Sequence, residues 1–416
     1  MTHPLPNFGI TYSNLNENHQ CFKQARLVTE QMIESIKEKQ DFYKIFDIEN
    51  AKQQAKSCSH HATYIRDNFA DLIIVGMGGA ILNPATTISL VAEKNLSTKI
   101  HFLHSTDPLY LQKTLSSISL KSCAVLVISN SGETLETNAL LGTLIAEFQK
   151  NKINDLGKHF YFITNPVEGT LYKVAKRIGA TILPHADKIS GRYSGLTNVT
   201  TFASQIAGID VEQYLEGAKN TIDDFLNNQE QSQSVLAAAA IFNTSKPMMI
   251  NIGYLQQFDI FLEWYSQIIA ESLGKAGKGI TPVRGLGPND QHSMLQLYLG
   301  GPKDKLYSLF YVKELPQGLL QYKTEQLDEL DYISNKNLQD IHSANFSATK
   351  HALISHNLPN RIIMLKDLSA KSVGALVAHS MLEIIVLSNL MQINPFNQPG
   401  VELIKTESKR IVKEGV

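Results

Sequence analysis

Short apolar runs alternate with helical segments along most of this 416-residue chain, and this alternation constrains the fold more than any other feature. The runs lie at residues 72–75, 100–103, 124–128 and 160–163, and His101 is the one charged or strongly polar residue in them. Such runs are typical of strands buried on both faces, because a strand with one wet face would alternate polar and apolar residues. Helical segments separate them, so we predict a parallel sheet covered by helices, the doubly wound α/β architecture.

The same alternation returns in the second half of the chain. Residues 247–252, 306–312 and 361–365 are strand candidates, and helical runs lie near 258–273, 338–351 and 370–391. We therefore expect two doubly wound, mainly parallel α/β domains of similar design with helical N- and C-terminal extensions. The predicted boundaries are a helical extension at 1–50, a first domain at 51–210, a helical connection at 211–245, and a second domain with a C-terminal helix at 246–416.

Composition and charge narrow the class of partner. Lysine and arginine total 38 against 39 aspartates and glutamates, giving a net charge of -1, so no global field attracts polyanions and we expect no nucleic acid partner. The cysteines, Cys21, Cys58 and Cys123, are too few and odd in number for a disulfide framework. This usage fits a reducing compartment, and we predict the cytoplasm.

The longest apolar segment, residues 373–393, raises the question of a membrane span. It carries His379, Glu383, Ser388 and Asn389, which would cost several kcal/mol in hydrocarbon. We therefore predict a buried core helix and no membrane partner. Residues 1–9 lack the basic stretch and apolar run of a signal peptide.

A glycine-rich turn directly follows the first predicted strand, where residues 74–80 read IVGMGGA. Gly76, Gly78 and Gly79 would let backbone amides approach a ligand at the C-terminal end of a parallel strand. A dinucleotide site fails the spacing test, because Ile81 stands where the third glycine of that motif belongs. A tight turn without a ligand stays open as the alternative.

A hydroxyl-rich loop follows a second predicted strand and opens a helix, where residues 127–134 read VISNSGET. Ser129, Ser131 and Thr134 combine short donors with free amides and the positive end of the helix dipole, which suits a phosphate monoester. There is no P-loop lysine, so nucleoside triphosphate chemistry is not indicated. The alternative is that Ser131 or Thr134 merely caps the helix. We favour phosphate binding.

This loop resembles the phosphate-binding loop of the sugar isomerase (SIS) domain superfamily, and four further segments resemble the glucose-6-phosphate isomerase family within it. Residues 189–194 read ISGRYS, similar to the signature G-G-R-[FY]-S with Ser190 in place of the first glycine. Residues 393–405 read INPFNQPGVELIK, similar to F-[DN]-Q-x-G-V-E-x-x-K. Residues 267–275 (QIIAESLGK) and 287–293 (GPNDQHS) resemble Q-x-x-x-E-S-N-G-K and G-x-x-x-Q-H-[AS].

The resemblance implies reversible isomerisation of glucose 6-phosphate and fructose 6-phosphate, in glycolysis and gluconeogenesis, by ring opening and proton transfer through a cis-enediolate. It makes Glu271 the base that moves the proton between C1 and C2, and Arg192 the cation that stabilises the enediolate. His292, supplied by the second subunit of a homodimer with shared active sites, and Lys405 would open the ring. The implied substrate- and phosphate-binding residues are Gly78, Gly79, Ser129, Ser131, Thr134, Gln267 and Gln398.

Several points stay open. Ala80, Asn130 and Leu273 depart from the family pattern, so affinity or sugar preference could differ. One alternative is a dual isomerase that also accepts mannose 6-phosphate, and another is a phosphosugar-binding regulator without catalysis. We expect no cofactor and no metal, because the grouping at residues 58–61 lacks a second ligand pair at zinc-site spacing.

Overall fold

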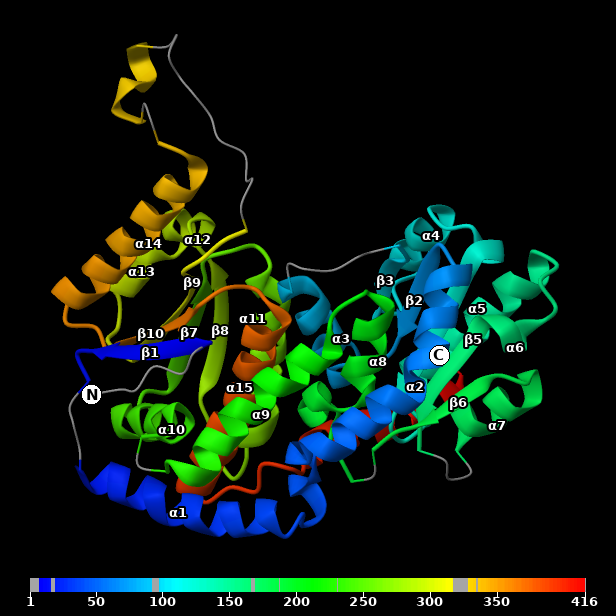
Figure 1. Ribbon diagram of the computed structural model, residues 1–416, viewed down its shortest axis with the longest axis horizontal. Coiled ribbons are helices and arrows are strands. Elements are labelled where there is room, and N and C mark those ends of the chain that lie inside the picture. The colour runs from blue at the N-terminus through cyan, green and yellow to red at the C-terminus, as the bar shows by residue number, and fades with distance from the viewer. Residues whose placement is uncertain are drawn as a thin grey trace.

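The computed structural model describes residues 7–15, 19–91, 97–165, 169–186, 188–229, 231–316, 328–333 and 336–415. Within these residues the chain forms two five-stranded sheets that lie side by side, with helices around and between them (Figure 1). The mainly parallel α/β architecture predicted from the alternation is confirmed.

The first sheet is parallel throughout, with the strand order β3-β2-β4-β5-β6. Its strands are β2 (Asp71–Val75), β3 (Lys99–Leu103), β4 (Cys123–Ser129), β5 (Phe160–Thr164) and β6 (Thr181–Pro184). The sequence did not reveal β6, because this four-residue edge strand is only partly buried. Between the strands lie α3 (Gly79–Leu90), α4 (Pro108–Ser116), η2 (Leu120–Ser122), α5 (Leu135–Lys150), α6 (Leu156–His159) and α7 (Thr170–Ile178).

Burial on both faces explains why the central strands β2, β4 and β5 read as unbroken apolar runs. Along β2, Leu72 and Ile74 face the main hydrophobic core of the protein. Ile73 and Val75 face a separate cluster that includes residues of α5. Since successive side chains of a strand point to opposite faces, all four must be apolar.

The second sheet has the order β1-β10-β9-β7-β8. Its strands are β1 (Phe8–Ser13), β7 (Met248–Gly253), β8 (Thr281–Leu286), β9 (Lys305–Val312) and β10 (Asn360–Leu365). The order β8-β7-β9-β10 repeats the order β3-β2-β4-β5 of the first sheet, as expected for two units of similar design. β8 was missed because it is a half-exposed edge strand that contains Pro282.

Strand β1 corrects the prediction that residues 1–50 form a purely helical extension. It pairs antiparallel with β10, and Phe8 and Ile10 are buried whereas Thr11 is exposed. A short edge strand of this kind needs only alternate apolar residues, a weaker signal than the helical periodicity that follows it. Helix α1 (His19–Lys37) does lie within the predicted helical region.

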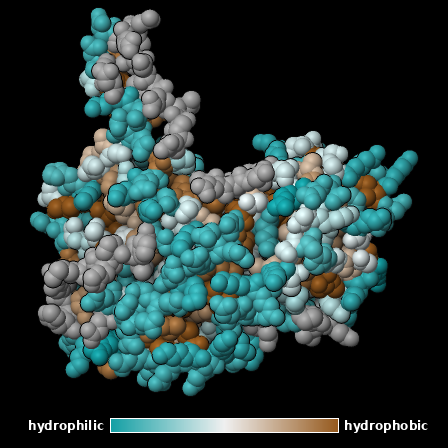
Figure 2. All heavy atoms as spheres, viewed as in Figure 1, coloured by the Kyte–Doolittle hydropathy of each residue, from teal (hydrophilic) through white to brown (hydrophobic). Residues whose placement is uncertain are grey.

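Helix α15 (Ala370–Leu390) contains most of the apolar segment for which we weighed a membrane span against a buried core helix. By length and composition it could cross a membrane, yet 94% of its apolar window is buried inside the protein. It packs against α9 (Val211–Asn227) and α10 (Gln233–Thr244). The prediction of a buried core helix is confirmed. Figure 2 shows a mainly hydrophilic face with only small, separate hydrophobic patches.

The remaining helices complete the layers around the two sheets. They are η1 (Asp41–Phe46), α2 (Ile48–Asn68), η3 (Gly191–Leu196), α8 (Asn198–Ile206), α11 (Phe258–Leu273), α12 (Asn289–Ser293), α13 (Leu295–Gly300), η4 (Asp328–Ile333), α14 (Leu338–Ser355) and α16 (Pro399–Glu414). Each end of the chain packs against the sheet formed by the other half of the sequence. The N-terminal strand β1 joins the second sheet, whereas the C-terminal helix α16 contacts α5 beside the first sheet (Figure 1).

Candidate active site

A cavity of about 380 Å³ lies at the carboxyl edge of the first sheet. Its wall is built from the glycine turn before α3, the hydroxyl-rich loop before α5, the turn before η3, helix α11, and the start of α16. Segments far apart in the sequence therefore meet at one place. Of the predicted site residues, those that line the cavity are Gly78, Gly79, Ser129, Ser131, Thr134, Arg192, Gln267, Glu271, Gln398 and Lys405.

The glycine turn is shaped by close backbone contacts. Gly78 has a φ of +55°, and a Cβ there would lie 2.8 Å from Gln267 Nε2. A Cβ on Gly79 would lie 2.2 Å from the backbone carbonyl of Gly191. The Asn83 side chain donates to the carbonyls of both Gly79 and Gly191, at 2.6 and 2.8 Å. Glycine is required at both positions so that the turn before α3 can meet α11 and η3.

The hydroxyl-rich loop directly follows β4. Ser129 Oγ and Thr134 Oγ1 lie 3.1 Å apart within hydrogen-bonding distance, and Ser131 Oγ accepts the Glu133 backbone N–H at 3.2 Å. Thr134 is the N-cap residue of α5, but its side chain makes no capping hydrogen bond. The alternative that Thr134 merely caps the helix is therefore not observed, and the N-terminus of a 16-residue helix adjoins the cavity.

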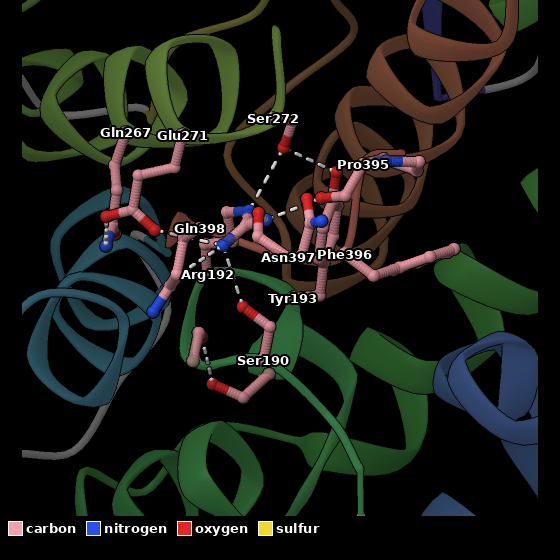
Figure 3. Close-up of polar contacts among 12 residues, drawn as sticks. Ser190, Arg192, Tyr193, Gln267, Glu271, Ser272, Pro395, Phe396, Asn397 and Gln398 are labelled. Carbon is pink, nitrogen blue, oxygen red and sulfur yellow. Dashed lines mark hydrogen bonds and ion pairs between the residues drawn. The ribbon is translucent and has the colours of Figure 1, made fainter. Parts of the chain in front are cut away.

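Arg192 lies at the centre of the polar contacts in Figure 3 and is 1% exposed. Its Nε donates to Ser272 Oγ at 3.0 Å, and its Nη2 donates to the backbone carbonyls of Pro395 and Asn397. The indole N–H of Trp264 donates to the carbonyl of Arg192 at 3.0 Å. These contacts fix the buried side of the guanidinium between α11 and the segment that leads into α16.

The Nη1 atom is the part of the guanidinium that meets the cavity-lining side chains. It donates to Glu271 Oε2 at 3.0 Å, to Ser190 Oγ at 2.9 Å and to Gln398 Oε1 (Figure 3). These acceptors come from three separate segments, and Arg192 joins them at one point. A permanent cation is thus held within hydrogen-bonding distance of the predicted base.

Glu271 is held by both of its carboxylate oxygens and still opens to the cavity. Gln267, one helical turn earlier on α11, donates from Nε2 to Glu271 Oε1 at 2.8 Å. Arg192 holds the other oxygen, and 24% of the Glu271 side chain is exposed. An oriented, accessible carboxylate beside a fixed cation can exchange a proton with a bound molecule, because geometry and charge are set before the ligand arrives.

Lys275 is a neighbour of this centre that the sequence analysis did not single out, although it ends the QIIAESLGK segment. Its Nζ donates to the carbonyls of Ser272 at 3.1 Å and Asn394 at 2.5 Å. Burial, and then the charge of Arg192, lower the pKa of Lys275 to about 8. The lysine joins the end of α11 to the segment that holds Arg192.

His185 and Ser190 also line the cavity and were not predicted as site residues. His185 directly follows β6 and is 5% exposed, and burial lowers its pKa. Its Nδ1 lies 2.9 Å from the carbonyl of Ala186. His185 had no recognisable signal in the sequence, because β6 itself was not recognised. Ser190 was noted only as a departure from a glycine.

The two residues predicted to open the sugar ring, Lys405 and His292, do not lie at the same cavity in the folded chain. Lys405 lines the cavity from α16, and its Nζ pairs with Glu402 Oε1 at 2.8 Å. His292 is exposed on α12 next to the second sheet, and it does not line the cavity. The structure therefore groups all of the predicted site residues except His292.

Comparisons of the sequence with known proteins identify one family over most of the chain. Residues 34–303 and 321–415 match the family model described as phosphoglucose isomerase. The chain is 33% identical over 350 residues to the glucose-6-phosphate isomerase of Campylobacter jejuni, covering 82% of this chain and 85% of that protein. It is 31% identical over 351 residues to the glucose-6-phosphate isomerase of Rubrobacter xylanophilus, covering 81% of each.

A solved structure also resembles the fold. The crystal structure of a glucose-6-phosphate isomerase from Chlamydia trachomatis superposes with a TM-score of 0.86, covering 98% of this chain and 89% of that chain. The identity is 20%, so this likeness supports the fold alone.

Proposed function

The chain belongs to the phosphoglucose isomerase family, and from this premise we propose that it is an aldose-ketose isomerase that interconverts glucose 6-phosphate and fructose 6-phosphate. One observation carries the proposal: an open carboxylate, a fixed guanidinium and a hydroxyl-rich loop at a helix N-terminus line the same cavity. A phosphosugar needs all three, one for its phosphate and two for proton transfer beside its carbonyl.

The phosphate binds at the loop of residues 129–134. The hydroxyls of Ser129, Ser131 and Thr134 and the first amides of α5 supply neutral donors, and the helix dipole adds positive potential. The glycine turn at Gly78 and Gly79 forms the adjoining wall. Anchoring the phosphate leaves the rest of the sugar within the cavity that Glu271 also lines.

Glu271 acts as the base of the isomerisation. Its carboxylate takes the proton from C2 of the open aldose and returns it to C1, while the hydroxyl proton on O2 moves to O1, so the ketose forms with no net change in composition. Negative charge builds on the enediolate oxygen as the proton leaves. Arg192 stabilises this charge, and one preorganised donor of this kind contributes about 3 kcal/mol. Gln267 keeps the carboxylate oriented.

Lys405 and His292 open the ring before proton transfer. His292 is exposed and lies outside the cavity of its own chain, so the site is completed by His292 of the partner subunit in a homodimer with shared active sites. Histidine is suited to this step because it titrates near neutrality. We place the enzyme in the cytoplasm, in glycolysis and gluconeogenesis, and the three free cysteines fit that compartment.

The domain division supports a site between two units. We propose a first domain at residues 51–210 and a second at 246–416, joined by the helical connection at 211–245. β1 adds an edge strand to the second domain, and α16 reaches back to the first. Glu271 comes from the second domain and the phosphate loop from the first, so their relative placement sets the distance between base and phosphate.

A coupled spectrophotometric assay with fructose 6-phosphate tests the proposal directly. We expect turnover that requires no added metal or cofactor. Binding of the sugar phosphate without turnover would favour a regulator without catalysis, and absence of both would overturn the proposal. The same assay with mannose 6-phosphate decides between a single and a dual specificity, since comparable turnover of both sugars would establish the dual enzyme.

A further inference from the structure

The guanidinium of Arg192 has an unequal distribution of hydrogen-bond partners. It carries five N–H hydrogens, one on Nε and two on each Nη. Nε has one acceptor and Nη2 has two, so the buried side is matched. Nη1 has three acceptors for its two hydrogens, and these are Ser190 Oγ, Glu271 Oε2 and Gln398 Oε1. The surplus acceptor lies on the cavity side.

Among these three acceptors, Ser190 differs in its chemistry. Glu271 has a charged oxygen and forms the stronger, charge-assisted bond, and Gln398 contributes a carbonyl oxygen. Ser190 offers a hydroxyl, which accepts a hydrogen from Arg192 and also has one hydrogen of its own to donate. Across the ranges that the structure describes, that hydrogen has no acceptor. Ser190 lines the cavity, and Figure 3 shows its side chain beside the guanidinium of Arg192.

We propose that Ser190 is a further substrate-contacting residue, whose hydroxyl donates to the same sugar oxygen that Arg192 binds during isomerisation. When a ligand oxygen takes an Nη1 hydrogen, one of the two neutral acceptors must be released, and we assign this role to Ser190 because its bond to Nη1 is longer than that of Gln398, at 2.9 against 2.5 Å. Its hydroxyl can then turn and donate to the ligand. The enediolate oxygen would thus receive one charged and one neutral donor. This inference rests on the proposed function.

The backbone at Ser190 permits a clean test. Its φ of -65° and ψ of 141° suit any L-residue, so no glycine is required there, in contrast to Gly79. The side chain is half-buried at the cavity wall. Replacement by alanine removes the hydroxyl alone and leaves the remaining Nη1 acceptors, Glu271 and Gln398, in place for its two hydrogens. We therefore expect Ser190→Ala to fold with unchanged thermal stability.

Steady-state kinetics and inhibitor binding, measured side by side, test the proposal. For Ser190→Ala we expect kcat to fall about tenfold or more, the size of one hydrogen bond to a charged oxygen, with KM changed little. A phosphorylated sugar acid, whose carboxylate imitates the enediolate, should bind about tenfold more weakly. A phosphorylated polyol, which has no reacting carbonyl, should bind to Ser190→Ala with the same affinity as to the wild type. Ser190→Thr keeps a hydroxyl and should recover most of kcat.

The control is Ser57→Ala, whose hydroxyl bonds within the exposed face of α2 and should change none of these quantities. Wild-type kcat and sugar-acid affinity in Ser190→Ala would overturn the inference. So would equal weakening of both inhibitors, because that result indicates a change in cavity shape. Failure of the proposed function is a different outcome, since the wild type itself would then show no turnover of fructose 6-phosphate.

Discussion

Arg192 and Arg361 are both 1% exposed, and each forms an ion pair with a glutamate on a neighbouring helix. Arg361 lies on β10, and both oxygens of Glu383 accept from its guanidinium, at 2.5 and 3.3 Å. The hydroxyl of Tyr265 also contacts Glu383, and His379 Nε2 lies 3.3 Å from it. Every group in this second centre is satisfied by protein.

The two centres differ in the state of the carboxylate. Glu383 is 1% exposed, whereas 24% of the Glu271 side chain opens to the cavity. Burial by itself would raise the pKa of Glu383, but Arg361 and His379 outweigh it and hold the pKa at about 2. A sealed carboxylate cannot meet a ligand, so the Arg361 centre acts on stability. A carboxylate that opens to a cavity can contact a ligand, so the arginine–glutamate pair at Arg192 is able to take part in a reaction.

The largest effect should come from Glu271→Gln, which separates chemistry from stability at the open centre. Glutamine keeps the size and the contact with Arg192 but cannot take a proton, so we expect kcat to fall by about 10³-fold or more. The melting temperature and the affinity for a phosphorylated polyol should stay near wild type. Near-normal turnover would reject Glu271 as the base. Glu263→Gln, at a partly exposed position on the same helix outside the cavity, is the matched control and should keep full activity.

Glu383→Gln should show the reverse pattern at the sealed centre. Removing one partner leaves the Arg361 charge buried and unpaired, which destabilises a protein by about 3–5 kcal/mol. Denaturant unfolding measures this loss, and kcat per folded molecule should stay within about twofold because no cavity residue changes. The double variant Arg361→Met/Glu383→Leu should recover part of the stability. A loss of kcat with full stability would break the comparison.

Much of the fold was predictable, and burial decides which parts were. Strands such as β2 and β4 are covered on both faces, so their apolar runs stand out in the sequence. The missed strands β1, β6 and β8 lie at sheet edges, where half of each strand or more is only partly buried or exposed. Edge strands need fewer apolar residues, and their pairing depends on distant segments that a local pattern does not contain.

The candidate site was predictable only through its motifs. Glu271 taken alone is an ordinary helix glutamate, and its neighbours in QIIAESLGK single it out. The backbone carbonyls of Pro395 and Asn397 that hold Arg192 have no side-chain signature, so no pattern could reveal them. The pairing of Glu383 with Arg361 was missed for a related reason. The two residues lie on different elements, and only the fold brings them together.

Ser131→Asp should have a smaller effect than either glutamate variant. It adds a charge beside the cavity, whereas the glutamate variants remove one. A carboxylate in the hydroxyl-rich loop would repel a bound phosphate, so we expect affinity for a phosphorylated inhibitor to fall about tenfold or more with little change in stability. The loss should shrink as salt rises, because exposed charges are screened. Ser131→Ala serves as the control for the lost hydroxyl. Unchanged affinity would show that the phosphate binds elsewhere.

Acid should produce the smallest effect and act on the sealed centre. The pKa of Glu383 is held near 2 in the folded protein, below its ordinary value of 4.5. A lowered folded-state pKa contributes stability that is present above the unfolded pKa and is lost as pH falls toward 2. The stability difference between wild type and Glu383→Gln should therefore shrink by about 1 kcal/mol between pH 7 and pH 4, as measured by urea unfolding. If the stability difference did not change with pH over this range, Glu383 would have an ordinary pKa in the folded protein. Arg361 would then not stabilise the charged form of Glu383.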